Sequence, residues 1–288
     1  MANVIGILGG DLRSVYLANA LAHSFEVHVF YLEGRYPFDP QVHLEGGEQS
    51  LLARCPAVVL PVPVCQRGLW LNAPLWKGEV PLSVCLEGLP AGTKVFGGGI
   101  TGVIRTMAGK GKLELTELLD QEELTVRNAL PTAEGALEIA LRETDRTIRG
   151  SKCLVVGYGR IGRLLCGMLR ALGAEVTAAC RGTEELAWAE TEGCQTLPME
   201  ELQSAAQWVD IAFNTAPAQV LTEAFISGMR PDGVIIDLAS LPGGTDFEAA
   251  RVRGIKAIHG LGLPGKCAPR TAGEAIARTV EKLLRKER

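Results

Sequence analysis

The feature that most constrains the fold is a regular alternation of strand and helix patterns that begins at Ser151. Short apolar runs such as KCLVVG, EVTAAC, DIAFN and GVIIDLA are separated by segments with helical periodicity. Strands that alternate with helices in this way predict a parallel sheet with helices on both faces. We therefore expect residues 149–288, including a last helix over about 268–285, to form a Rossmann-type doubly wound domain.

The N-terminal half predicts a second α/β domain. Residues 4–8, 12–23 and 26–30 read as strand, helix and strand, residues 33–50 as a loop, residues 57–64 as a buried strand, and another strand begins at Lys94. A mostly helical stretch follows from Asp120 to Arg142. Pro131 interrupts it, and because proline favours the first turn of a helix, we expect a new helix to begin there. This helix, over about 131–148, would link a flavodoxin-like or Rossmann-like substrate domain at residues 1–130 to the second domain.

Composition excludes several classes of protein. The net charge is only −4, which does not favour a nucleic-acid-binding face. None of the 8 cysteines forms a CxxC pair, so we expect free thiols in a reducing compartment and no zinc or iron–sulfur site. The opening run MANVIGILGG lacks preceding basic residues and is ended by Gly9-Gly10-Asp11, so we expect neither a signal peptide nor a membrane span.

The best-defined motif is a GxGxxG sequence between a predicted strand and a predicted helix. In dinucleotide-binding folds the first glycine allows a tight turn, the second lets the backbone approach the pyrophosphate, and the third lets the helix pack closely on the strand. The N–H groups of the helix N-terminus then face the phosphates. The predicted cofactor contacts of this loop are Gly157, Tyr158, Gly159, Arg160, Ile161 and Gly162.

The end of the next strand predicts which dinucleotide binds. NAD-binding enzymes usually place an acidic residue there to accept a hydrogen bond from the ribose 2′-hydroxyl. This chain instead reads Cys180-Arg181-Gly182-Thr183. Arg181 can pair with a 2′-phosphate, and Thr183 offers a hydroxyl donor. The sequence therefore predicts NADP in preference to NAD.

Three further segments follow predicted strands, at the edge where doubly wound sheets bind ligands. Residues 260–266 fit the spacing of a phosphate-binding P-loop, but Cys267 replaces the magnesium-binding Ser or Thr and the proline at 264 lacks an N–H group. We expect a rigid loop there instead. Together with the segments Asn214–Pro217 and Asp237–Ser240, this loop would line the cleft for nicotinamide and substrate. The predicted cofactor contacts are Asn214, Thr215, Pro217, Leu238, Ala239, Ser240, Gly262 and Pro264.

Hydride transfer also requires a group that takes or gives a proton. His259 at a strand end and Glu134 in the segment PTAEG are the candidates, with Lys266 as a nearby cation. In the first domain, Asp11 would repel phosphate at the helix N-terminus, so we interpret Gly9-Gly10-Asp11 as a substrate-domain turn. The predicted substrate contacts are Asp11, Arg13, Arg105, Thr132 and Thr271, and no metal site is predicted.

Several of these segments together resemble one known family. They are GGDLR from Gly9, LPVPV from Leu60, NALPTAEGAL from Asn128, VVGYGRIG, NTAP, DLASLPGGTDF from Asp237 and GLPGKCAPRTAG from Gly262. Their order and sequence resemble the dipicolinate synthase A-subunit family from about residue 4 to residue 284.

The resemblance implies an NADP-dependent dehydrogenase that forms pyridine-2,6-dicarboxylate from a dihydro- or hydroxytetrahydro-dipicolinate of the lysine pathway. It also implies that the partner is the flavoprotein-like B subunit of dipicolinate synthase, and a place in the mother-cell cytoplasm of a spore-forming bacterium. A dicarboxylate would suit the cations Lys266, Arg13 and Arg105, in an active site expected between the domains. A homo-oligomer is left open.

Two other functions remain. A 2-hydroxy-acid or amino-acid dehydrogenase of similar two-domain design would use His259 with an acidic or lysine partner. A non-catalytic regulatory subunit would bind NADP without turnover. Activity on a panel of 2-keto acids would favour the first, and dinucleotide binding without any turnover would favour the second.

Overall fold

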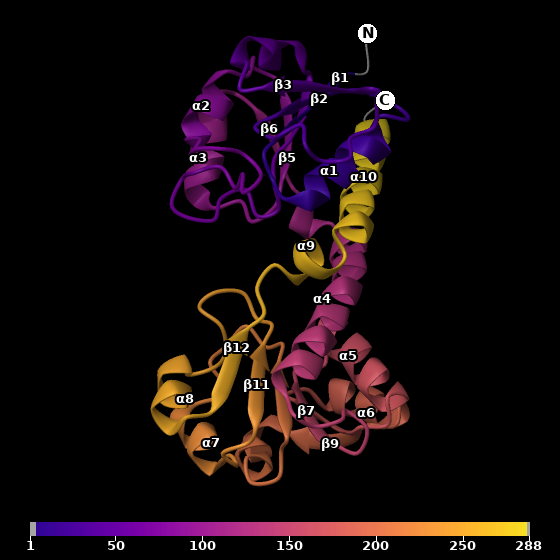
Figure 1. Ribbon diagram of the computed structural model, residues 1–288, viewed down its shortest axis with the longest axis vertical. Coiled ribbons are helices and arrows are strands. Elements are labelled where there is room, and N and C mark those ends of the chain that lie inside the picture. The colour runs from indigo at the N-terminus through magenta and orange to yellow at the C-terminus, as the bar shows by residue number, and fades with distance from the viewer. Residues whose placement is uncertain (1–3, 287–288) are drawn as a thin grey trace. The chain divides into compact units, whose positions relative to one another are not determined.

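The chain folds into two units, each built around a six-stranded parallel sheet (Figure 1). The computed structural model describes residues 4–286. The first unit comprises the residues up to Asn128 together with those from Ala268 onward, and the second comprises Ala129–Cys267. The expected fold class, two α/β domains of which the second is Rossmann-type, is confirmed.

The first sheet has the strand order β3-β2-β1-β4-β5-β6. Its strands are β1 (Val4–Leu8), β2 (Glu26–Phe30), β3 (Val42–Gly46), β4 (Ala57–Val59), β5 (Lys94–Gly97) and β6 (Glu114–Glu117). One face is covered by α1 (Leu12–Leu21) and α10 (Pro269–Lys286). The other face is covered by α2 (Leu82–Glu87), α3 (Gly102–Lys110) and the 3-10 helix η1 (Gln49–Arg54). A second 3-10 helix, η2 (Leu118–Asp120), follows β6.

The second sheet has the strand order β12-β11-β10-β7-β8-β9. Written in the opposite direction and counted from its own first strand, β7, this is the same order as in the first sheet. Its strands are β7 (Lys152–Val156), β8 (Glu175–Cys180), β9 (Gln195–Pro198), β10 (Ile211–Asn214), β11 (Val234–Asp237) and β12 (Lys256–His259). The helices are α5 (Arg160–Ala171), α6 (Thr183–Thr191), α7 (Glu223–Gly228), α8 (Phe247–Arg253) and α9 (Leu263–Cys267), with the 3-10 helix η3 (Met199–Ala205). The helix α4 (Glu122–Glu143) begins in the first unit and ends in the second.

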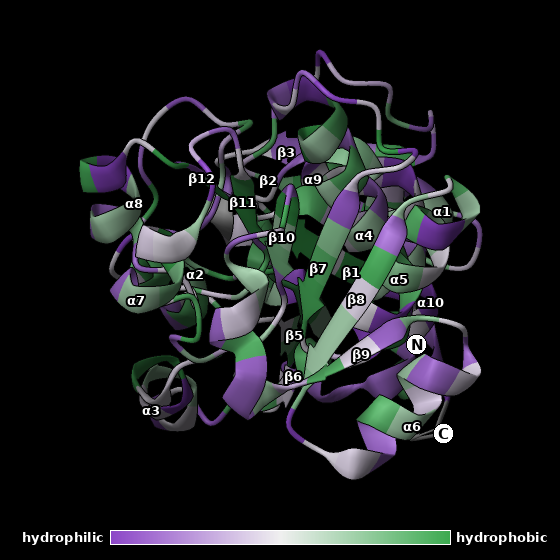
Figure 2. Ribbon diagram, turned by 90° about the horizontal axis from the view of Figure 1, so that it is seen from below, coloured by the Kyte–Doolittle hydropathy of each residue, from purple (hydrophilic) through white to green (hydrophobic). Residues whose placement is uncertain are grey.

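The central strands are apolar along their length because both faces of the sheet are covered. In β7, Cys153 and Val155 pack with α5 and α6, whereas Leu154 and Val156 pack with α7 and η3. Figure 2 shows the hydrophobic residues along β7 and β8. Alternate residues therefore serve two separate cores, as a doubly wound sheet requires.

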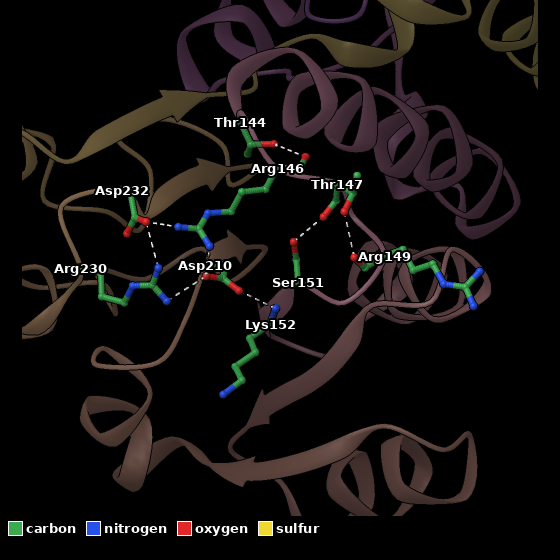
Figure 3. Close-up of polar contacts among 9 residues, drawn as sticks. All are labelled: Thr144, Arg146, Thr147, Arg149, Ser151, Lys152, Asp210, Arg230 and Asp232. Carbon is green, nitrogen blue, oxygen red and sulfur yellow. Dashed lines mark hydrogen bonds and ion pairs between the residues drawn. The ribbon is translucent and has the colours of Figure 1, made fainter.

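A network of two arginines and two aspartates joins the N-terminal ends of three strands in the second unit (Figure 3). Asp210, just before β10, accepts the backbone N–H of Lys152 at 2.8 Å and contacts Arg230 at 3.2 Å. Arg146 pairs with Asp210 at 3.3 Å and also with Asp232. This edge lies opposite the carboxyl ends of the strands, so we assign the network to structure rather than to ligand binding.

The last helix belongs to the first unit, and not to the second as the sequence suggested. Its apolar stripe, which includes Ile276 and Val280, is buried in the core shared with α1. α10 can approach α1 closely because Gly273 has no side chain. A side-chain carbon at this position would overlap the backbone of Arg13 on α1. An amphipathic pattern shows that a helix covers a sheet, but it does not identify which of two similar sheets.

The helix expected to begin at Pro131 does not begin there. Instead α4 runs without a break from Glu122 to Glu143, with Pro131 in its interior. Proline removes the helical hydrogen bond to the carbonyl of Arg127. Val126, Arg127 and Leu130 are exposed, so water can satisfy that carbonyl.

Other boundaries differ from expectation at chain positions with weak patterns. The expected loop 33–50 contains β3, an edge strand in which Leu44 is exposed. The expected strand 57–64 ends at Val59, since Pro61 and Pro63 cannot donate to a sheet. Strand β9 and η3 were not anticipated.

Candidate functional site

The glycine loop joins β7 to α5 at the point where the order of the second sheet reverses, between β7 and β10. Gly157 has a φ of 92°, which side chains rarely adopt, and a side-chain carbon there would lie 2.5 Å from Thr215 Oγ1. A side-chain carbon at Gly162 would overlap the carbonyl oxygen of Gly157. Both glycines are therefore required by the fold itself.

Gly159 is different, because nothing within 4 Å would meet a side-chain carbon at that position. It is the N-cap residue of α5, and no side chain caps the helix there. The start of α5 consequently lies beside a backbone position that carries no side chain. This arrangement fits a pyrophosphate, which needs close backbone approach at a helix N-terminus.

Tyr158 takes part in the loop only through its backbone. Its side chain is buried, and its hydroxyl donates to Glu192 Oε2 at 2.7 Å. Arg163 on α5 also pairs with Glu192 and lies over the Trp188 ring at 4.5 Å. The hydrogen bonds from Arg163 and from the tyrosine hold the pKa of Glu192 below its usual range. Glu192, which the sequence did not reveal, thus fastens α5 to the end of α6.

The other two variable positions of the loop lie at the start of α5. Arg160 is the first residue of the helix and is exposed. Ile161 is partly buried against the core of the second unit. We therefore count Ile161 as a packing residue, and Arg160 as a position that solvent or a ligand can reach.

Arg181 and Thr183 lie where the sequence placed them, directly after β8 and at the start of α6, and both are exposed. The sequence patterns did not indicate that Glu185 also lies at this strand end. The carboxylate of Glu185 folds back onto Gly182, the N-cap residue of α6, where a side-chain carbon would overlap it. Burial, together with the charge of Glu185, raises the pKa of the Cys180 thiol to about 11. An acidic group and a basic group therefore both stand at the end of β8.

The side chains of Asn214 and Thr215 form hydrogen bonds with other groups of the protein. The Thr215 hydroxyl donates to the carbonyl of Val156 at 2.9 Å. Asn214 is fully buried, and its amide donates to Ala216 O at 3.1 Å and to Asp237 Oδ1 at 3.0 Å. They shape the loop after β10, while Pro217 is exposed on it.

A buried carboxylate organises the loop that follows β11. Asp237 is fully buried and accepts hydrogen bonds from Ala239 N at 3.0 Å and Gly244 N at 2.8 Å, besides that from Asn214. Leu238 and Ala239 are buried by this fold of the chain, whereas Ser240 is exposed. A carboxylate that accepts several N–H bonds fixes the backbone around it. Asp237 therefore sets the shape of residues 238–244.

His259, at the end of β12, holds the same loop from the other side. Its Nε2 lies 2.7 Å from the carbonyl oxygen of Ala239, and its ring stacks on Phe247 with centroids 5.2 Å apart. Because a carbonyl can only accept, Nε2 carries a proton, and Nδ1 is then the acceptor nitrogen of the neutral ring. The structure thus orients His259 and defines its tautomer.

The segment after β12 is not the rigid loop that the sequence suggested. Residues 263–267 form the short helix α9, with Pro264 in its first turn and Lys266 exposed. Gly262 has a φ of 68° and lets the chain enter this helix. α9 packs on α4 at Gly135, where a side-chain carbon would lie 3.0 Å from Cys267 Sγ.

The remaining candidates are spread over both units. Glu134 is exposed and Thr132 is half-buried, and both lie on α4 rather than in a turn. Arg105 is exposed on α3, and Thr271 is exposed on α10. Asp11 and Arg13 are in direct contact, as a bidentate ion pair at the start of α1.

The cysteines play no part in a metal site or disulfide. All of them are free thiols. Burial raises the pKa of Cys85 and of Cys153 to about 12, so these two are unreactive. Over residues 4–286 the structure contains no group of three or more His, Cys, Asp or Glu side chains able to hold a metal ion. Within the same range, no helix is long and apolar enough to cross a membrane.

Comparisons with known proteins account for both units. Residues 4–119 match the N-terminal domain of the dipicolinate synthase A subunit, and residues 132–240 match the NAD-binding domain of D-isomer-specific 2-hydroxyacid dehydrogenases. The dipicolinate synthase A subunit of Bacillus subtilis (strain 168) is 33% identical over 287 residues, which covers 97% of this chain and 95% of the relative. The chain belongs to the dipicolinate synthase A-subunit family.

Solved structures of dipicolinate synthase A subunits have the same fold. The dipicolinate synthase A subunit from Bacillus halodurans superposes with a TM-score of 0.90 at 29% identity, covering 98% of this chain and 97% of that one. A transhydrogenase from Sinorhizobium meliloti superposes with a TM-score of 0.75 at 18% identity, covering 99% of this chain and 94% of that one, and shows the fold alone. This member of the dipicolinate synthase A-subunit family is thus an NAD(P)-dependent oxidoreductase, and the glycine sequence 157–162 lies within the matched NAD-binding domain.

Proposed function

We propose that this protein is an NADP-dependent dehydrogenase that forms pyridine-2,6-dicarboxylate from a dihydro- or hydroxytetrahydro-dipicolinate. The observation that carries the proposal is a complete dinucleotide loop, with open space at Gly159, in a chain that matches a dipicolinate synthase A subunit over nearly its whole length. A hydroxytetrahydro ring first loses one water to give the dihydro ring, and aromatisation of the dihydro ring then removes one hydride and one proton. When bound, the nicotinamide accepts the hydride, and a base accepts the proton.

We assign the residues of the second unit the following roles. The backbone at Gly157–Gly162 and the first turn of α5 hold the pyrophosphate. Asp237 fixes the loop 238–244, which is the proposed nicotinamide side of the site. Among the predicted proton-transfer residues, His259 has the clearest support, because Nδ1 is its acceptor nitrogen and its ring is held at Nε2. Glu134 and Lys266 are exposed and have no comparable positioning.

Arg181 supports NADP as the cofactor, since its guanidinium can pair with a 2′-phosphate. Glu185 supports NAD, because its carboxylate lies by Gly182 at the same strand end and could accept a hydrogen bond from a 2′-hydroxyl. Replacing Arg181 by Asp tests the choice. We expect the variant to bind NADPH at least about tenfold more weakly and NADH as well as before. An unchanged ratio, with a shift caused instead by Glu185→Gln, would assign the protein to NAD.

The proposal extends to partner and place in the cell. The relatives are named as one subunit of a synthase, which supports a second subunit for this protein too. We propose that this partner is the flavoprotein-like B subunit. We also propose the sporulating mother-cell cytoplasm as its location.

The decisive assay follows NADPH formation and pyridine absorbance with purified protein, alone and with the B subunit, on dihydrodipicolinate. We expect both signals to appear together, and to be strongly reduced in a Gly159→Ala variant at an NADP concentration that just saturates the wild type. If neither signal appears in either setting while NADPH still binds, the protein is a regulatory subunit. If activity appears only on a 2-keto acid panel, it is a 2-hydroxy-acid or amino-acid dehydrogenase.

A further inference from the structure

The first sheet has its own switch point, and a partly buried ion pair occupies it. The chain order reverses between β1 and β4, and ligands of doubly wound sheets bind outside the carboxyl ends of strands at such a point. Asp11 and Arg13 follow β1 there, at the start of α1. They line a small crevice together with Pro61 and Val62, which follow β4. The crevice has room for about one water molecule, and thus for one small polar group of a ligand.

The geometry of the pair leaves one face of each partner available. Asp11 Oδ1 caps α1 by accepting Arg13 N at 3.0 Å. The same carboxylate accepts Arg13 Nε at 2.9 Å and Nη2 at 2.8 Å. Among the described residues, the structure records no partner for Nη1 of Arg13. The Arg13 side chain is 10% exposed and that of Asp11 is 27% exposed, so the carboxylate is the more accessible group.

Stability does not explain why the pair is there. A cation in the first turn of a helix meets the positive end of the helix dipole, and burial removes its hydration. A buried ion pair generally stabilises a fold no better than apolar residues of similar volume. Apart from Ser14, the other side chains that line the crevice are apolar, among them Leu60 and Ile276. A leucine at position 13 would therefore suit the surroundings, and the arginine calls for another reason.

We propose that the Asp11–Arg13 pair binds a carboxylate that carries an N–H or O–H donor on its neighbouring atom, as in cyclic imino or amino acids. The ligand carboxylate accepts from Arg13 Nη1, and the adjacent donor is accepted by the exposed oxygen of Asp11. The apolar side chains at the crevice then contact the carbon skeleton outside it. No bond is made or broken in this step.

This inference deepens the proposed function and takes its link to the reaction from it. A partly saturated ring nitrogen can carry a proton at neutral pH, which gives Asp11 a donor. A pyridine nitrogen flanked by carboxylates presents only a lone pair, which the Asp11 carboxylate repels. The pair should therefore retain the ring before oxidation and release it once it is aromatic.

Calorimetric titration of the full chain with three probes of one shape tests the inference. The probes are cis-piperidine-2,6-dicarboxylate, pyridine-2,6-dicarboxylate and benzene-1,3-dicarboxylate. Only the first offers N–H donors beside a carboxylate, so we expect it to bind about 10- to 100-fold more tightly than the other two. Equal affinities for all three probes would overturn the inference.

Two variants and a control locate the effect. Asp11→Asn keeps an N-cap residue of equal quality, so α1 remains intact. We expect it to lose the preference for the saturated ring. Arg13→Met should weaken all three probes, whereas Arg54→Met, at the exposed end of η1, should weaken none. A preference that survives in Asp11→Asn would also overturn the inference.

The readouts separate this inference from the proposed function. Probe binding requires neither dinucleotide nor turnover, and dinucleotide affinity reports on the second unit in every variant. Selective probe binding without dehydrogenase activity would leave the inference standing and reject the proposed reaction. Dehydrogenase activity without selective probe binding would do the reverse.

Discussion

Adding one methyl group at two glycines of the same loop should have opposite consequences. At Gly159, φ is −80°, which alanine adopts readily, and no protein atom lies within 4 Å of the added carbon. Gly159→Ala should therefore cost only about 1 kcal/mol of folding stability, as expected for alanine at an N-cap. The added carbon instead occupies the space through which the backbone would approach a pyrophosphate. Loss of one or two charge-assisted hydrogen bonds, about 3 kcal/mol, predicts roughly a 100-fold weaker dinucleotide.

Gly162→Ala should act on the fold. The added carbon would lie 3.0 Å from the carbonyl carbon of Gly157 and would overlap its oxygen, so α5 must move away from β7. Overpacking of this kind costs about 3 kcal/mol, which for a unit of this size lowers Tm by roughly 6–12 °C. Thermal unfolding and calorimetric NADPH titration of both variants measure the two effects. Normal NADPH affinity in Gly159→Ala, or wild-type Tm in Gly162→Ala, would refute the reasoning.

Three further substitutions test the interactions around the sheet of the second unit. Asp237→Asn turns an amide N–H toward backbone donors, so urea unfolding should show a loss of about 2 kcal/mol, and retained stability would contradict the assigned bonds. Asp210→Asn weakens the network in Figure 3 and should lower stability by about 1–3 kcal/mol without changing dinucleotide affinity, because it lies at the opposite edge of the sheet. Arg163 and Tyr158 lower the pKa of Glu192, so the stability they provide is present above the usual glutamate pKa and is lost as pH falls through the lowered value. Glu192→Gln should therefore differ from wild type at neutral pH and converge with it in acid, and parallel pH profiles of thermal unfolding would contradict this.

Sequence patterns predicted what depends on local periodicity. The six-residue strand β8 coincides with the predicted apolar run EVTAAC, since such runs are encoded in neighbouring residues. Patterns could not assign α10 to the first unit, because its stripe fits either sheet. Nor could they show that α4 passes through Pro131, because a proline inside a helix depends on the exposure of the preceding turn, where Val126, Arg127 and Leu130 are exposed.

The same distinction applies to the candidate site. The roles of Gly157 and Gly162 follow from spacing, and the structure gives each its steric reason. Glu192 was missed because its partner Tyr158 lies 34 positions away in the chain. Asn214 was predicted to contact ligand, yet its amide donates to Asp237 on the neighbouring strand. A side chain at a strand end faces either a ligand or the next strand, and only the three-dimensional register decides between them.

The two switch points show how one topology can be given two chemistries. Both sheets have the same strand order, and in both a glycine-containing turn leads from the first strand to a helix. At α5 the N-cap is Gly159, which places no side chain at the helix N-terminus where a phosphate would bind. At α1 the N-cap is Asp11, whose carboxylate already accepts from the helix backbone and would repel an anion there. Arg13 restores a cation beside that carboxylate, so this switch point favours a ligand that carries both a negative group and a donor. Because the two sheets share one strand order, we expect the residue at the N-cap, rather than the topology, to decide which of the two units binds the dinucleotide.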